Sequence, residues 1–316
     1  MNKLKTIIKR LWFILFAGIA FITLFIISVN YNVSNLFGGM PSLQDLEKPE
    51  SELSSELYSS DNILLGKYFR YNRSPVKFDE LSDELITTLL VTEDIRFYEH
   101  SGIDLKGLVR ATYGVVKNVA TFGSSGLEGG GSTISQQLAK NLFKIRREKK
   151  GKLSNVPFLG LIISKVKEWI VAVKLEEFYT KKEILAMYLN TAEYGSNSYG
   201  IKVAAKTYFD KEPSELNYNE SSIIVGLLNK PTKYNPFFNP DNATEKRAEI
   251  FYNLYKYNIV NKTEYDSLIL SDLNLNYKVQ NQNVGQATYF RTVVRNYLIS
   301  WAKENGYDLF SDGLKI

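Results

Sequence analysis

The sequence predicts a mainly α-helical protein preceded by one membrane-spanning helix. Two observations support this prediction. An uncharged apolar run, LWFILFAGIAFITLFIISV, occupies residues 11–29 and is long enough to cross a bilayer as a single helix. From Phe78 to about residue 235, apolar residues such as Leu81, Leu85 and Leu89 recur with the spacing of amphipathic helices.

Composition narrows the classes of function. The chain of 316 residues is 44% hydrophobic and 23% charged, as in globular proteins. Its net charge of +5 is compatible with anionic lipid or phosphate partners, but it is no footprint of nucleic-acid binding. The absence of cysteine excludes disulfides and thiol catalysis, and the single histidine, His100, excludes a multi-histidine metal site.

The charges around the apolar run predict its orientation. Four basic residues precede the run: Lys3, Lys5, Lys9 and Arg10. No basic residue follows it until Lys48, so the positive-inside bias makes residues 1–10 a cytoplasmic tail and places the rest of the chain outside. A cleaved signal peptide is the alternative, although the run is longer than a usual signal core and no small-x-small cleavage site follows closely.

The remaining chain divides by composition and period. Residues 30–55 are rich in Asn, Ser, Gly and Glu and indicate a juxtamembrane linker, and residues 56–71 predict a small hairpin. A glycine-rich loop is expected at 122–131. Helices are expected at 161–178, 181–190, 200–209 and 220–229, with a further one after Asn235. The last sixty or so residues show no compact pattern.

The segment EDIRFYEHSG, residues 93–102, brings acidic and aromatic residues together. On a continuous helix Glu93, Phe97 and His100 share one face. A carboxylate beside an aromatic ring and an imidazole is partly desolvated, which suits a general base. The alternative is a surface helix with Glu–Arg pairs, whose end His100 caps against Gly102.

The segment GGGSTISQQLAKN, residues 129–141, places a glycine run before a predicted helix. Backbone N–H groups at such a helix start favour anions, and Ser132 or Thr133 could cap the helix. Gln136 and Gln137 point to different faces, and Lys140 lies one turn beyond Gln136. A ligand with phosphate or sugar groups would use these side chains, whereas the alternative is an ordinary capped helix after a loop. The spacing is not that of a Walker A loop.

Two further segments are less specific by pattern. Lys165 and Glu168 are i, i+3 neighbours, which alone indicates a surface ion pair. The segment KEILAMYLN, residues 182–190, indicates mainly core packing.

Taken in order, these segments resemble the five motifs of the peptidoglycan glycosyltransferases, family 51, the membrane-bound polymerases found in class A penicillin-binding proteins and as stand-alone enzymes. The matching segments are EDIRFYEHSGID (93–104), GGSTISQQLAKN (130–141), KVKE (165–168), KKEILAMYLN (181–190) and YGIKVAAKTYF (199–209). The resemblance covers residues 56–240, which we expect to form the glycosyltransferase domain. It implies a mainly helical, lysozyme-like fold with a small membrane-associated lobe beside a long cleft.

The resemblance also implies an activity, the inverting polymerisation of lipid II into β-1,4 glycan strands with release of polyprenyl pyrophosphate. Glu93 corresponds to the general base and Glu168 to a second catalytic carboxylate, which could also hold a divalent cation, Mg²⁺ or Mn²⁺; no organic cofactor is expected. The positions expected to bind substrate are Asp94, Phe97, His100, Ser132, Thr133, Gln136, Gln137, Lys140, Asn141 and Lys165.

The chain departs from the family pattern in places. Ser164 replaces an arginine of the third motif, for which Arg146 or Arg147 could compensate, and Ala186 replaces a glutamate of the fourth. Residues 241–316 resemble the linker and the start of the transpeptidase region of bifunctional penicillin-binding proteins, and we expect that region to be truncated. No Lys-Thr-Gly or Lys-Ser-Gly occurs in the chain.

The resemblance predicts a single-pass protein of the bacterial inner membrane with its catalytic domain on the periplasmic side. Its expected partners are lipid II, the growing glycan strand, membrane lipid and other cell-wall synthesis proteins, but no nucleic acid. Phe122, Leu127 and Phe143 are candidates for contact with the bilayer. Two alternatives stay open: a lysozyme-like hydrolase or lytic transglycosylase, which also uses one helix-borne glutamate, and an inactive bitopic scaffold.

Overall fold

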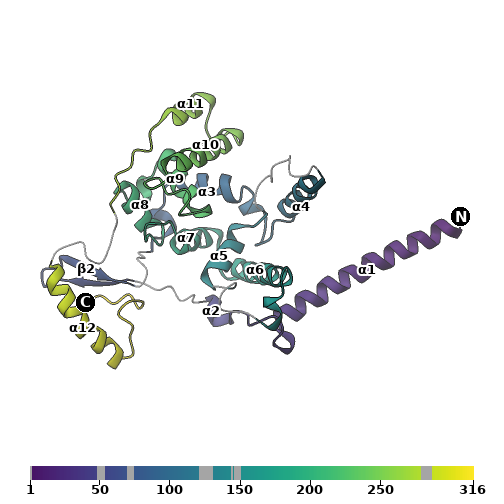
Figure 1. Ribbon diagram of the computed structural model, residues 1–316, viewed down its shortest axis with the longest axis horizontal. Coiled ribbons are helices and arrows are strands. Elements are labelled where there is room, and N and C mark those ends of the chain that lie inside the picture. Colours follow the sequence, from purple (N-terminus) through teal and green to yellow (C-terminus); the bar gives the residue numbers. More distant parts are fainter. Residues whose placement is uncertain are drawn as a thin grey trace.

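The computed structural model describes residues 2–47, 54–69, 75–120, 131–143, 145, 151–278 and 287–316. It confirms a mainly helical protein with one N-terminal apolar helix (Figure 1). The first helices are α1 (Asn2–Asn30), α2 (Leu43–Glu47), α3 (Asp83–Glu93), α4 (Leu105–Ala120), α5 (Ile134–Leu142) and α6 (Leu159–Phe178). They are followed by α7 (Lys181–Thr191), α8 (Ile201–Phe209), α9 (Tyr218–Asn229), α10 (Pro240–Lys256), α11 (Lys262–Leu270) and α12 (Thr288–Glu304).

Helix α1 projects away from the rest of the chain, and its stretch Lys5–Asn30 is long and apolar enough to cross a membrane (Figure 1). Among the described residues, the last turns of α1 pack on α6. Val29 is fully buried and packs with Ile163 and Val166 of α6, while Phe25 and Ile26 contact the same cluster. The end of α1 is therefore packed on α6 and does not simply precede a linker.

The main core lies between α3, α5, α7, α8 and α9. Its fully buried members include Leu89, Leu138, Leu189 and Ile224. Local capping explains where several helices begin: Thr133 accepts the N–H of Gln136 at the start of α5. Capping boxes also begin α7 and α9. The helices predicted at 181–190, 200–209 and 220–229 are thus confirmed within a few residues.

Two expectations from the sequence are wrong. The helix predicted to run from Glu93 to His100 instead ends at Glu93, because Asp94 has φ −158° and ψ 74°. Only a short 3₁₀ turn, Phe97–Glu99, follows. Phe143 is 8% exposed and packs in the main core, so it is not available to a bilayer. Phe122 and Leu127 lie outside the described residues.

The predicted hairpin forms from β1 (Ser55–Tyr58) and β2 (Leu64–Tyr68), which pair antiparallel. Its packing partner is the C-terminal part of the chain. The N–H of Tyr58 donates to the carbonyl of Ile316 at 2.7 Å, and that of Glu56 to the carbonyl of Leu314 at 2.8 Å. A separate small core joins the hairpin to α12 through Leu57, Tyr68, Leu298, Ala302 and Leu309.

Helices α10 and α11 belong with the main helical body. Helix α10 packs on α9 and α3, and its Ile250 is fully buried in the main core. Leu273, Leu275 and Tyr277, which follow α11, also pack on that core. This arrangement lets α10 form one wall of the cavity described next.

Candidate active site

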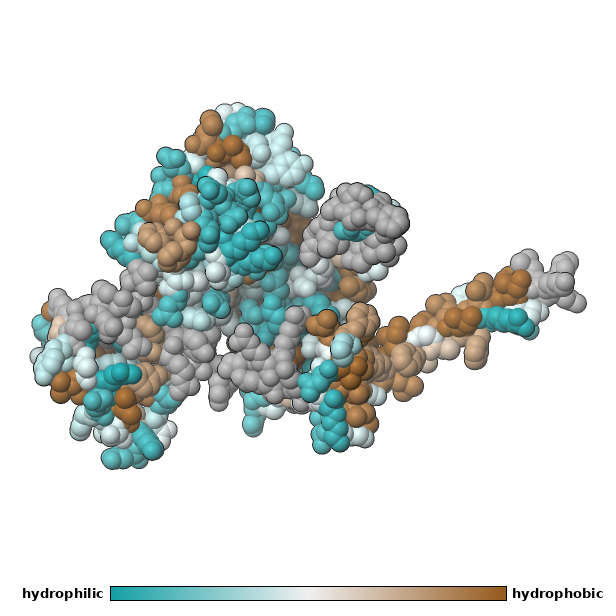
Figure 2. Space-filling model, viewed as in Figure 1, coloured by the Kyte–Doolittle hydropathy of each residue, from teal (hydrophilic) through white to brown (hydrophobic). Residues whose placement is uncertain are grey.

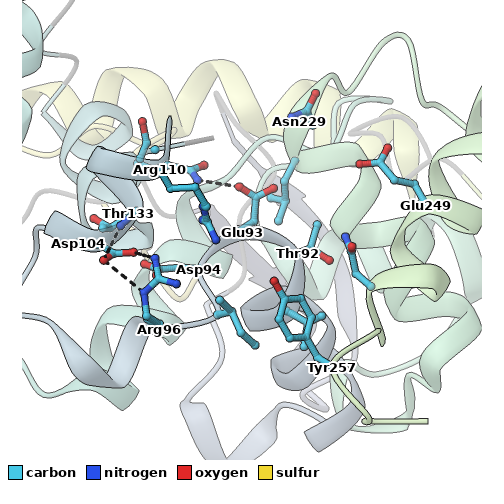
Figure 3. Close-up of a pocket in the computed structure, with 18 of the residues that line it drawn as sticks. Thr92, Glu93, Asp94, Arg96, Asp104, Arg110, Thr133, Asn229, Glu249 and Tyr257 are labelled. Carbon is cyan, nitrogen blue, oxygen red and sulfur yellow. Dashed lines mark hydrogen bonds and ion pairs between the residues drawn. The ribbon is translucent and has the colours of Figure 1, made fainter. Parts of the chain in front are cut away.

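A cavity of about 800 Å³ opens where α3 ends, between the starts of α4 and α5 on one side and α10 on the other (Figure 3). Its charged and amide-bearing lining residues are Glu93, Asp94, Arg96, Asp104, Arg110, Gln137, Lys140, Asn229, Lys246, Glu249, Asn253 and Lys256. The volume lies in the range of ligand sites. The lining carries both carboxylates and cations, so it suits a polar, charged ligand.

Glu93 is the last residue of α3 and is half-buried in the cavity wall. Figure 3 shows its carboxylate lying between Arg110 on one side and Asn229 on the other. The Nε2 of Gln137 donates a hydrogen bond of 2.7 Å to its Oε2. Because α3 ends at this residue, the side chain lies at the C-terminal end of the helix, where a ligand in the cavity can reach it.

Asp94 explains why α3 stops here. Its carboxylate is buried and accepts the backbone N–H of Ile134, the first residue of α5, at 3.0 Å. Nε2 of His100 lies 3.1 Å from both carboxylate oxygens. A carboxylate at a helix start also interacts favourably with the helix dipole. Asp94 therefore joins α3 to α5. His100 contacts Asp94, whereas a continuous helix would have placed it on the same face as Glu93.

Gly102 provides a second link between the two motifs. Its carbonyl accepts the hydroxyl of Thr133 at 2.7 Å and the amide Nε2 of Gln136 at 3.1 Å. Gly102 has φ +88°, a conformation that favours glycine, and its α-carbon faces the backbone of Ala172 in α6. Gln136 is 1% exposed, so in this structure it holds the loop and does not line the cavity.

Lys165 and Glu168 are not the surface pair that their spacing alone indicates. Nζ of Lys165 lies 3.0 Å from Oε2 of Glu168 and donates to the hydroxyl of Ser132 at 2.7 Å. The Glu168 side chain is 2% exposed. Ser132 lines the cavity and Lys165 does not, so the hydrogen bond between them connects α6 to the cavity wall.

Arg96 and Asp104 form an ion pair at the cavity edge, and the N–H of Gly107 donates to Asp104 at 2.9 Å. Burial opposes the charged form of the Asp104 carboxyl, but the hydrogen bonds from Arg96 and Gly107 outweigh burial and hold its pKa below the usual value. This pair fixes the start of α4, which carries Arg110 into the cavity lining.

The wall formed by α10 was not predicted as part of the site. Lys246, Glu249, Asn253 and Lys256 line the cavity at positions i, i+3, i+7 and i+10 of one helix. Nζ of Lys246 lies 2.9 Å from the Glu249 carboxylate. This helical spacing of polar residues was a usable signal, but the motif resemblance ends near residue 240, before this helix.

The structure divides the residues predicted from the sequence into two groups. Those that line the cavity are Glu93, Asp94, Ser132, Thr133, Gln137 and Lys140. Those placed behind or beside it are Phe97, His100, Gln136, Asn141, Lys165 and Glu168. Phe97 is fully buried, with Nζ of Lys181 4.2 Å from its ring centre, so it supports the site from within the core.

The surroundings of Glu168 fit its predicted role as a metal ligand only in part. Among the described residues there is no group of three or more His, Cys, Asp or Glu side chains suited to a metal ion. Glu168 is a single buried carboxylate already paired with Lys165. Ser164, which replaces the family arginine, donates to the carbonyl of Gly160 at 2.8 Å, and Arg146 and Arg147 lie outside the described residues.

The chain is similar in sequence to known proteins. The sequence model described as Transglycosylase matches residues 61–255. Penicillin-binding protein 1A of Pseudomonas aeruginosa is 30% identical over 88% of this chain and 31% of its own length. For penicillin-binding protein 1A of Escherichia coli the identity is 31%, over 88% of this chain and 30% of that protein.

The chain thus spans about a third of the length of the curated relatives that it matches. A solved structure of penicillin-binding protein 1A from Haemophilus influenzae aligns with 84% of this chain and 26% of its own, with a TM-score of 0.45 and 21% identity.

Proposed function

Because the chain belongs to the transglycosylase family, we propose that it is a membrane-anchored peptidoglycan glycosyltransferase that polymerises lipid II into β-1,4 glycan strands. The observation that carries this proposal is that one cavity holds both a carboxylate suited to act as a base, Glu93, and basic residues suited to a diphosphate, Arg110 and Lys140. A transferase that expels a lipid pyrophosphate requires both groups.

In the proposed reaction the Glu93 carboxylate takes the proton from the 4-hydroxyl of the acceptor sugar. The acceptor oxygen attacks the anomeric carbon of the donor as the bond from that carbon to the phosphate oxygen breaks, with inversion at carbon. Both electrons of the broken bond leave with the polyprenyl pyrophosphate. A base held in this way typically contributes about 10²–10⁴-fold to the rate.

The charge that develops on the leaving pyrophosphate requires donors and cations. Lys140 and Arg110 line the cavity on the side of α4 and α5, together with Ser132. Lys165 lies behind Ser132 and orients its hydroxyl. We assign these side chains to the donor pyrophosphate and the amide of Gln137 to the reacting centre.

A divalent cation would supply further charge neutralisation on the pyrophosphate. Magnesium is often held by one or two carboxylates together with substrate phosphates and water. Glu168 could serve as such a carboxylate only if Lys165 moved away from it, since the two are paired at 3.0 Å. The fit is therefore incomplete, and no step of the proposed mechanism depends on a cation.

The surface near the end of α1 suits a position at the bilayer. Figure 2 shows apolar residues along α1 and around its junction with α6. Phe158 and Leu161 are exposed there, and Leu105, Val109 and Tyr113 are exposed at i, i+4 and i+8 on α4. We propose that these residues touch the periplasmic leaflet of the inner membrane, where the lipid tail of the substrate lies.

The membrane proposal can be tested with single cysteines, because the chain has none. A polarity-sensitive fluorophore attached after Leu161→Cys should shift to the blue when the protein is reconstituted in vesicles. The control, Ser267→Cys, lies exposed on α11 and should show an aqueous spectrum. Equal aqueous spectra at both positions would remove this part of the proposal.

The catalytic proposal is tested with the full-length protein in detergent, labelled lipid II and gel separation of the glycan products. Wild type should form long strands, Glu93→Gln should form none, and Glu99→Gln, an exposed carboxylate nearby, should match wild type. Polymerisation by Glu93→Gln near the wild-type rate would disprove the assignment of the base. Release of soluble fragments from purified sacculi, without any polymer from lipid II, would instead favour a hydrolase or lytic transglycosylase.

A further inference from the structure

Three side chains from three helices form one hydrogen-bonded chain that ends at Glu93. The hydroxyl of Tyr188, in α7, donates to Oε1 of Gln137 at 2.9 Å. Nε2 of Gln137, in α5, donates to Oε2 of Glu93 at 2.7 Å. Within the described part of the chain, the Glu93 carboxylate accepts its hydrogen bond from Gln137.

The direction of this hydrogen-bond path follows from the Glu93 carboxylate. A carboxylate only accepts hydrogen bonds, so the NH₂ group of Gln137 faces Glu93 and its amide oxygen faces Tyr188. Tyr188 is 2% exposed in the main core. Burial, and secondarily the charge of Glu93, raises the pKa of Tyr188 well above its usual value, so the hydroxyl keeps the proton that it donates to Gln137.

We propose that Tyr188 and Gln137 are positioning residues for the base of the glycosyl transfer. They hold Oε2 of Glu93 and so aim Oε1 at the acceptor hydroxyl in the cavity, an inference that rests on the proposed function. Tyr188 is buried in the core and does not line the cavity, so it acts on Glu93 through Gln137.

Orientation of a base matters because proton transfer requires the two heavy atoms to approach to hydrogen-bond distance in the complex with substrate. Without the hydrogen bond from Gln137, the Glu93 carboxylate can rotate about its last side-chain bond, whose torsional wells are broad. This hydrogen bond is therefore expected to affect the rate of the chemical step and not the affinity for lipid II.

The test compares two buried tyrosines of the same core in the full-length protein. Tyr188→Phe removes the hydroxyl that orients Gln137. Tyr194→Phe is the matched control, because Tyr194 is also fully buried and its hydroxyl donates to the carbonyl of Leu189 at 3.0 Å. Both variants lose one buried hydrogen bond and should lose similar stability, which thermal unfolding measures.

With lipid II as substrate, Tyr188→Phe should lower kcat about tenfold with KM within about twofold of wild type, as expected for one lost orienting hydrogen bond. Tyr194→Phe should leave kcat unchanged. Gln137→Met, which keeps the length of the side chain without its hydrogen bonds, should lower kcat at least as much. Adding Tyr188→Phe to Gln137→Met should cause no further loss, since both act on one path.

Three outcomes would overturn the inference: equal kcat in the two tyrosine variants, a loss that falls on KM alone, or losses that multiply in the double variant. These results are distinguishable from failure of the proposed function. If wild type forms no polymer, or Glu93→Gln is fully active, the proposed function fails. If wild type is active and Glu93→Gln is not, the comparison of the two tyrosine variants and the double variant decide the role of Tyr188.

Discussion

Replacement of Asp94 tests whether the joint between α3 and α5 stabilises the site as strongly as its contacts imply. Asp94 is buried, caps the start of α5 through the N–H of Ile134, and bonds Nε2 of His100. Loss of a capping acceptor costs about 1 kcal/mol. An imidazole nitrogen left buried without its partner adds roughly 1–3 kcal/mol.

We therefore expect Asp94→Ala to lose roughly 3 kcal/mol of stability. For a domain of this size, 1 kcal/mol shifts the melting temperature by about 2–4 °C, so the expected decrease is roughly 6–12 °C. Asp94→Asn keeps one oxygen for the Ile134 N–H and should lose less. Glu99→Ala, at an exposed position, should change the stability by no more than about 0.5 kcal/mol.

The assay is thermal unfolding of the full-length protein in detergent, followed by circular dichroism of its helices. If Asp94→Ala melts within two or so degrees of Glu99→Ala, the joint contributes little and the reasoning from its hydrogen bonds is refuted. If Asp94→Asn is as damaging as Asp94→Ala, the charge and not the capping oxygen carries the effect.

Three further predictions concern the surroundings of the site. Gly102→Ala should destabilise the protein by more than about 2 kcal/mol, because φ is +88° and a Cβ would lie 2.8 Å from the α6 backbone. In Gly114→Ala the added Cβ meets nothing within 4 Å, so this variant should stabilise α4 by up to about 1 kcal/mol. Melting temperatures check both. The pKa of Asp104 is lowered in the folded protein, so its stabilising effect is present above the usual aspartate pKa of 3.8 and is lost as the pH falls through the folded-state pKa. The melting temperature of wild type should therefore drop more steeply below about pH 4 than that of Asp104→Asn. Val29→Asp places a charge in the contact of α1 with α6 and should make the connection after α1 sensitive to added protease, which Val29→Ala should not.

Features set by local sequence could be predicted well. The capping of α5 by Thr133 and the helices near 181 and 201 follow from residues only a few positions apart. The pairing of Lys165 with Glu168 was predicted from the i, i+3 spacing, but its burial was not, because burial depends on Ser132 and the helices that pack around it.

Features set by distant contacts could not be predicted. Helix α3 ends at Glu93 because Asp94 is held by a residue forty positions later, which no periodicity within the segment reveals. The hairpin was predicted, but its partner near Leu314 and Ile316 lies at the other end of the sequence. The packing of α10 on α3 and α9 places its polar residues at the site.

The site separates residues that hold the fold from residues that face the ligand, and this separation bears on every variant proposed. Gly102, Asp94 and Thr133 are buried, with Thr133 hydrogen-bonded to Gly102 and Asp94 to the N–H of Ile134, so their replacement should lower stability first and activity as a consequence. Glu93 instead lies half-buried at a helix end with one hydrogen bond to Gln137. Glu93→Gln keeps its shape and removes a charge from a partly desolvated wall, so it should unfold at the wild-type temperature or above while losing polymerisation. A large loss of stability in Glu93→Gln would show that this carboxylate belongs to the supporting structure, and its assignment as the base would then lose its physical ground.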